Sequence, residues 1–133
     1  MATRAPIRVL VCDDVAEMRR LVRSVLDEHE FSVVGEADNG HDAVRGAAEL
    51  RPDVVLLDLS MPGLDGLEAI PLIAQSSPAT GIVVFSGFAA DRMRQAAIAR
   101  GADRYIEKGE PLVALAAIVR EVAEARRNGG GSG

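Results

Sequence analysis

Short apolar runs alternate with longer amphipathic segments along most of the chain, and this alternation predicts the fold. Five of the runs have the length, the β-branched content and the flanking turn residues of strands. They are Ile7–Cys12, Phe31–Glu36, Val54–Leu57, Gly81–Phe85 and Ala102–Glu107. The third run is apolar at every position, a pattern typical of a parallel strand that is covered on both faces.

The segments after these runs carry apolar residues at helical spacing. Helices are predicted over 15–26, 41–50, 67–74, 89–100 and 111–127. Gly101 directly follows the fourth helix, where a left-handed cap is favoured, and Pro111 suits the first turn of the fifth. Strand and helix thus alternate five times, which predicts a doubly wound parallel α/β sheet with helices on both faces.

Length and composition indicate one folded domain. The chain has 133 residues, of which 48% are hydrophobic, and this is enough for a single sizeable core. We expect a domain over 7–127, preceded by an N-terminal tail over 1–6. The Gly- and Ser-rich residues 128–133 are expected to be a flexible tail or linker.

Charge and hydropathy exclude several classes of partner. The net charge is −5 and no basic stripe is visible, which argues against direct nucleic-acid binding. No apolar run approaches the ~20 residues of a membrane span, and the N-terminus lacks the apolar core of a secretory signal. The single cysteine, Cys12, excludes an internal disulfide and fits a reducing compartment. These features predict a cytoplasmic protein with a packed core thiol and no membrane contact.

Three aspartates and one lysine fall at the ends of predicted strands. Asp13 and Asp14 follow the first strand, Asp58 follows the third, and Lys108, the one lysine of the chain, follows the fifth. Because the carboxyl ends of parallel strands share one edge, where sites form, we expect these side chains in one pocket. An acidic pocket with a single ammonium suits a phosphoryl group and a divalent cation such as Mg²⁺, which prefers oxygen ligands.

The same positions suggest roles in phosphoryl transfer. Asp58 is a candidate nucleophile, a known covalent role of aspartate. Mg²⁺ and Lys108 would neutralise charge, and the hydroxyl of Ser86 could contact a phosphoryl oxygen, with Gly87 leaving space for the group. Each residue also has a simpler explanation: an aspartate can cap the next helix, Ser86-Gly87 can be a turn, and a lone lysine can be a solvated charge.

Together these residues resemble the receiver domain of two-component response regulators, the CheY-like family. The resemblance covers 7–127. The residues that carry it are Asp13-Asp14, Asp58 with Met61-Pro62 and Asp65-Gly66, Ser86-Gly87, Gly101-Ala102-Asp103, and Tyr105 with Lys108. It implies a flavodoxin-like, three-layer α/β/α fold with five parallel strands in the order 2-1-3-4-5 and five helices.

The resemblance also implies the chemistry of the site. Asp58 would accept a phosphoryl group from a sensor histidine kinase or a phosphotransfer protein. Asp14, Asp58 and the backbone carbonyl of Ser60 would bind Mg²⁺ directly, and Asp13 would act largely through water. The domain would catalyse its own phosphorylation and dephosphorylation, rather than turn over an external substrate.

A switch is implied as well. Ser86 and Lys108 would contact the phosphoryl group, and Tyr105 matches the family's switch aromatic. Phosphorylation would then change the face formed by the fourth helix, fifth strand and fifth helix, where an effector protein or a second copy could bind. One departure is Gly109, because many receivers carry proline after the lysine. We expect a trans Lys108–Gly109 bond, since a cis bond before a non-proline residue costs about 3–4 kcal/mol.

Three other classes of protein share parts of this pattern. A phosphatase of the haloacid dehalogenase type would carry a second aspartate two residues after the nucleophile, where this chain has Ser60. A flavodoxin would carry a phosphate-cradling loop where Asp13 and Asp14 would repel a phosphate. A degenerate receiver would act only as a phosphorylation-independent docking module, although here all the site positions hold suitable residues.

Overall fold

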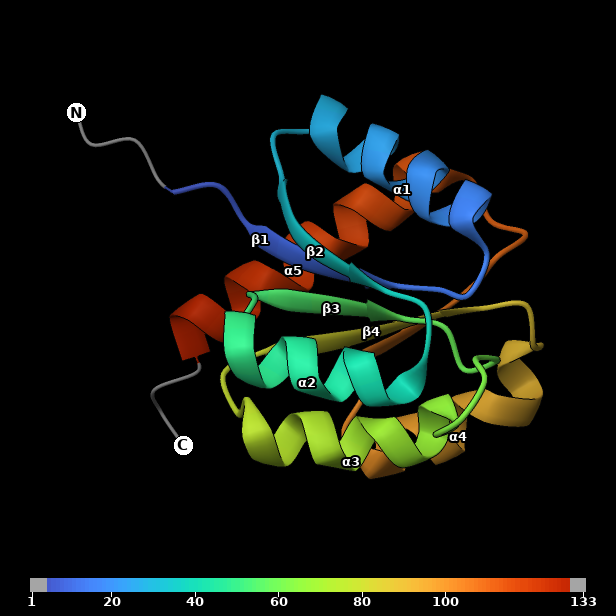
Figure 1. Ribbon diagram of the computed structural model, residues 1–133. Coiled ribbons are helices and arrows are strands. Elements are labelled where there is room, and N and C mark those ends of the chain that lie inside the picture. Colours follow the sequence, from blue (N-terminus) through green and yellow to red (C-terminus); the bar gives the residue numbers. More distant parts are fainter. Residues whose placement is uncertain (1–4, 130–133) are drawn as a thin grey trace.

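The five predicted strands are present and form one parallel sheet. The structure is a computed structural model and describes residues 5–129. The strand order is β2-β1-β3-β4-β5, which confirms the predicted topology (Figure 1). The strands are β1 Arg8–Cys12, β2 Ser32–Ala37, β3 Val54–Leu57, β4 Gly81–Ser86 and β5 Arg104–Glu107.

Helices cover both faces of the sheet, so the molecule has three layers. The helices are α1 Ala16–Glu28, α2 Gly40–Leu50, α3 Gly66–Ser76, α4 Ala90–Arg100 and α5 Leu112–Gly129. Helices α1 and α5 lie on one face, and α2, α3 and α4 lie on the other (Figure 1). This is the predicted flavodoxin-like arrangement. None of the helices within residues 5–129 is long and apolar enough to cross a membrane.

Two apolar clusters hold the layers together, one on each face of the sheet. In β1, Val9 and Val11 belong to the cluster under α1 and α5. Leu10 and Cys12 belong to the cluster on the opposite face. This alternation follows the two-residue period of a strand. Cys12 is buried, as predicted, and burial together with the charge of Asp13 raises the pKa of its thiol.

The predicted element boundaries agree with the structure to within a few residues. Gly101 has a positive φ of 123° after α4, which fits its predicted capping position. Helix α5 reaches Gly129, beyond the predicted domain end at 127. The rest of the predicted tail and most of the predicted N-terminal segment lie outside the described residues.

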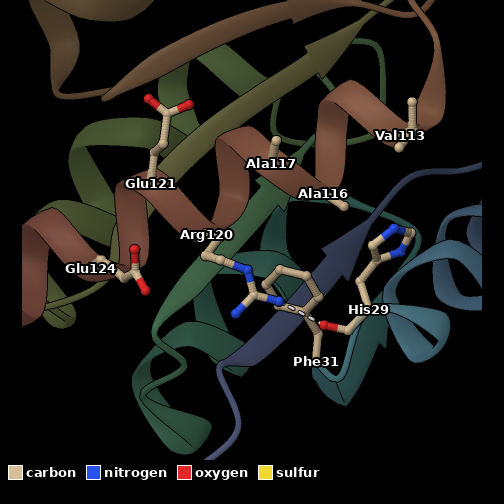
Figure 2. A pocket seen from close by; sticks show the side chains of 8 residues that line it. All are labelled: His29, Phe31, Val113, Ala116, Ala117, Arg120, Glu121 and Glu124. Atoms are coloured by element: carbon tan, nitrogen blue, oxygen red, sulfur yellow. Dashed lines mark hydrogen bonds between the residues drawn. The ribbon is translucent and has the colours of Figure 1, made fainter.

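Arg120 joins α5 to the turn between α1 and β2, at the edge of the sheet where the strands begin. Its guanidinium lies 4.7 Å from the centroid of the Phe31 ring and donates a 2.6 Å hydrogen bond to the carbonyl oxygen of His29. Figure 2 shows Arg120 lying across the pocket that these residues line with α5. The contact closes a sequence separation of 91 residues.

We expect Arg120→Ala to lower the free energy of unfolding by about 1–3 kcal/mol, because it removes a cation–π contact and a charge-assisted hydrogen bond. Urea unfolding measures the change. Arg20→Ala is the matched control: Arg20 is exposed on α1, and its loss should change stability by less than about 0.5 kcal/mol. Equal stability of the two variants would show that the Arg120 contact contributes nothing.

Candidate functional site

The ends of β1 and β3 bring the three predicted aspartates together. Cys12 pairs with Leu57, and the backbone N–H of Asp58 donates to the carbonyl oxygen of Cys12 at 3.0 Å. Asp13, Asp14 and Asp58 can each place one carboxylate oxygen within 4.8 Å of the others. Asp13 and Asp58 are both 3% exposed, whereas Asp14 is exposed. Two carboxylates of the group, those of Asp13 and Asp58, are thus buried, and the third, that of Asp14, faces solvent.

Lys108 completes the predicted group. Its Nζ lies 2.7 Å from Oδ2 of Asp13 and 3.3 Å from Oδ2 of Asp58. Burial by itself lowers the pKa of Lys108, but hydrogen bonds and charges from the two carboxylates outweigh it and leave the pKa raised. The backbone N–H of Lys108 donates to Ser86 at 2.8 Å, which ties β5 to β4. The bond to Gly109 is trans, as predicted.

The surroundings of Asp58 disfavour its charged form. Burial raises the pKa of its carboxyl group, and the charge of Asp13 adds to the increase. The Ser60 N–H, which donates to Oδ1 at 3.1 Å, and the Lys108 ammonium act in the opposite direction. The Lys108 ammonium thus contacts two of the three carboxylates, and a second cation would relieve the remaining repulsion.

The chemistry of the donor set fits Mg²⁺. Three carboxylates supply hard oxygen ligands, and the exposed Asp14 leaves room for the waters that Mg²⁺ retains. Asp14 and Ser60 also line a pocket that continues to Phe88 and Met93. The site therefore adjoins a pocket formed by the loops after β3 and β4.

The two predicted switch residues both hold Phe88 in the loop after β4. Ser86 is fully buried, and its Oγ accepts a 3.2 Å hydrogen bond from the Phe88 N–H. Tyr105 is half-buried and donates its hydroxyl to the Phe88 carbonyl oxygen at 2.8 Å. Burial raises the pKa of Tyr105. The structure thus brings Ser86 and Tyr105 to the same loop segment at Phe88, and within the described residues neither forms a hydrogen bond with the three aspartates.

The sequence did not predict that two glycines, Gly40 and Gly66, pack closely against the loop that follows Asp58. A Cβ atom on Gly66 would overlap Leu59 and lie 2.9 Å from the Asp58 carbonyl oxygen. A Cβ atom on Gly40 would overlap the carbonyl of Leu64. Glycine at these positions lets α2 and α3 begin directly against the loop that follows Asp58. Gly66 belongs to the residues that carry the resemblance, but its close contacts with Leu59 and Asp58 have no sequence signal.

The comparisons with known proteins agree with the fold and the site. The family model of the response regulator receiver domain matches residues 9–120. The chemotaxis protein CheY of Listeria monocytogenes is 36% identical over 102 residues, which are 77% of this chain and 86% of that protein. The chain therefore belongs to the response regulator receiver domains, which confirms the resemblance that the motifs indicated.

Solved structures support the same fold. The signal receiver domain of NarL from Mycobacterium tuberculosis has a TM-score of 0.85 at 29% identity, over 91% of this chain and 98% of that one. CheY in the CheX-CheY-BeF3-Mg complex from Borrelia burgdorferi has a TM-score of 0.83 at 22% identity, over 88% and 89% of the two chains. The protein is thus a two-component receiver domain whose acidic pocket, formed by Asp13, Asp14 and Asp58, serves phosphoacceptance.

Proposed function

We propose that Asp58 is the residue that receives the phosphoryl group. The observation that carries this assignment is its buried carboxylate, held between the Ser60 N–H on one oxygen and the Lys108 ammonium on the other. Oδ2 of Asp58 attacks phosphorus, and the bond from phosphorus to the donor's leaving group breaks, with the electron pair staying on that group. The product is an acyl phosphate.

The remaining site residues neutralise and position the transferred group. Lys108 pairs with a phosphoryl oxygen, and Ser86 turns its hydroxyl away from Phe88 toward the same group. Asp14, Asp58 and the backbone carbonyl of Ser60 are the proposed Mg²⁺ ligands, and Asp13 holds a bound water. Bound Mg²⁺ supplies charge neutralisation and orientation of the phosphoryl oxygens. The Mg²⁺ named for the Borrelia burgdorferi complex, a structure of similar fold, supports this choice of ion.

The proposed donor is a sensor histidine kinase or a phosphotransfer protein, whose phosphohistidine would lose its phosphoryl group to Asp58. The output surface is the face formed by α4, β5 and α5, where an effector protein or a second copy binds. Ser86 and Tyr105 support this link, because both hold Phe88, which lies just before α4. We propose that the receiver unit spans 7–127.

The test is phosphorylation of the purified protein by acetyl phosphate, followed by intact mass. We expect one added phosphoryl mass in Mg²⁺ and none in EDTA. Peptide mapping after borohydride reduction should place the modification at Asp58. A protein that gains no mass in Mg²⁺, although correctly folded, would instead be a docking module that works without phosphorylation.

A further inference from the structure

Helix α4 begins without a cap from its own sequence. The residue at its N-cap position is Ala89, which has no side chain that could accept a hydrogen bond. The first N–H groups of a helix need partners from outside the helix. Here the partner comes from a different element: Oε1 of Glu107, the last residue of β5, accepts the N–H of Ala90.

Glu107 acts together with Tyr105. Residues two apart in a strand point to the same side, and both side chains reach the segment that leads into α4. Tyr105 bonds the carbonyl oxygen of Phe88 at 2.8 Å, and Glu107 bonds the N–H of Ala90. Lys108, the next residue, reaches the aspartates instead. The end of β5 therefore contacts the start of α4 through Glu107 and the aspartates of the site through Lys108.

The hydrogen bonds from Tyr105 and Glu107 matter for the position of α4, because this helix has few apolar contacts. Ala97 is its one fully buried residue, and Met93 is partly buried against the core. A carboxylate at a helix N-terminus is favoured by the helix dipole, and hydrogen bonds to charged acceptors are among the stronger ones. The beginning of α4 thus depends largely on β5 for its position.

We propose that Glu107 is a positioning residue that holds α4 in its unphosphorylated arrangement and thereby lowers the affinity of the site for a phosphoryl group. The proposal rests on the function proposed above. When Ser86 turns to the phosphoryl group, its bond to Phe88 is lost, and the segment from Phe88 to Ala90 can move. A contact made only in the unphosphorylated state shifts the equilibrium toward that state. Binding of a phosphoryl group at Asp58 then has to overcome this stabilisation.

The test compares Glu107→Ala and Glu107→Gln with Glu110→Ala. Glu110 is the matched control, because it lies in the same turn and accepts the backbone N–H of Glu107 at 3.3 Å without reaching α4. Two quantities are measured for each protein: amide exchange of Ala90 to Met93 without ligand, and the affinity for beryllofluoride, a phosphoryl mimic, in Mg²⁺.

For Glu107→Ala we expect amide exchange at the start of α4 about five-fold faster and beryllofluoride binding about five-fold tighter, as loss of a helix cap predicts. Glu107→Gln should show smaller changes of the same sign, because its amide oxygen still accepts a hydrogen bond but carries no charge. Glu110→Ala should stay within about two-fold of the unmodified protein in both measurements.

Two results would overturn the proposal. Unchanged exchange at Ala90 would mean that Glu107 does not cap α4. Faster exchange with unchanged or weaker beryllofluoride affinity would mean that the cap is only structural and does not oppose activation. Failure of the unmodified protein to bind beryllofluoride in Mg²⁺ is a different result: it contradicts the proposed function and the coupling, while amide exchange still decides whether the cap exists.

Discussion

Replacing Asp58 with asparagine should abolish phosphoryl incorporation from acetyl phosphate. An amide oxygen is a poor nucleophile, and the change also removes one charge from the proposed Mg²⁺ ligands. Asparagine keeps the size of the side chain and an oxygen that can accept the Ser60 N–H, so the variant should stay folded. Intact mass after incubation in Mg²⁺ should show one phosphoryl group on the unmodified protein and none on the variant.

Asp65→Asn provides the matched control for this experiment. Asp65 lies in the same loop, and its side chain caps α3 by accepting the N–H of Glu68 at 3.0 Å. Asparagine is an equally good cap, so this variant should be phosphorylated like the unmodified protein. If Asp58→Asn gained the same mass as Asp65→Asn, another residue would be the phosphoacceptor.

The strand ends could be predicted from sequence because they depend on local pattern and topology. Four apolar residues run from Val54 to Leu57 and end at Asp58, so the carboxylate had to lie at the carboxyl edge of a covered strand. Parallel pairing then placed Asp13 and Lys108 at the same edge. Hydrophobic pattern, breaker residues and the shared edge together determine which side chains meet.

Side-chain contacts between distant elements could not be predicted in this way. Glu107 is one acidic residue among many in the sequence, and only the folded chain shows that it reaches Ala90, 17 residues away. The end of α5 is a second example, because the helix continues to Gly129, two residues beyond its predicted end at 127. Arg126 and Arg127 in the last turns of α5 form ion pairs with Asp103 and Asp53. These ion pairs hold the end of the helix against the sheet, although glycine disfavours helix.

Replacing Lys108 with methionine should destabilise the protein in the absence of Mg²⁺. The change leaves the buried carboxylates of Asp13 and Asp58 without the ammonium that lies 2.7 Å and 3.3 Å from them. Breaking a fully buried ion pair costs about 3–5 kcal/mol. We expect about 2 kcal/mol here, because the side chain of Lys108 is 20% exposed and solvent screens part of the charge. Urea unfolding in EDTA measures the loss.

Magnesium distinguishes this electrostatic effect from a loss of packing. In the unmodified protein Lys108 already neutralises part of the acidic group, whereas in Lys108→Met the cation meets three carboxylates alone. Mg²⁺ should therefore bind the variant more tightly and stabilise it more, since a ligand that binds only the folded state adds a stability that grows with the logarithm of its affinity. Arg45→Met removes an exposed ion pair with Asp42 and should change stability by less than about 0.5 kcal/mol, with no added response to Mg²⁺. Equal stabilisation of Lys108→Met and Arg45→Met by Mg²⁺ would show that Lys108 does not weaken cation binding at these aspartates, and stabilisation of neither would contradict a cation site there.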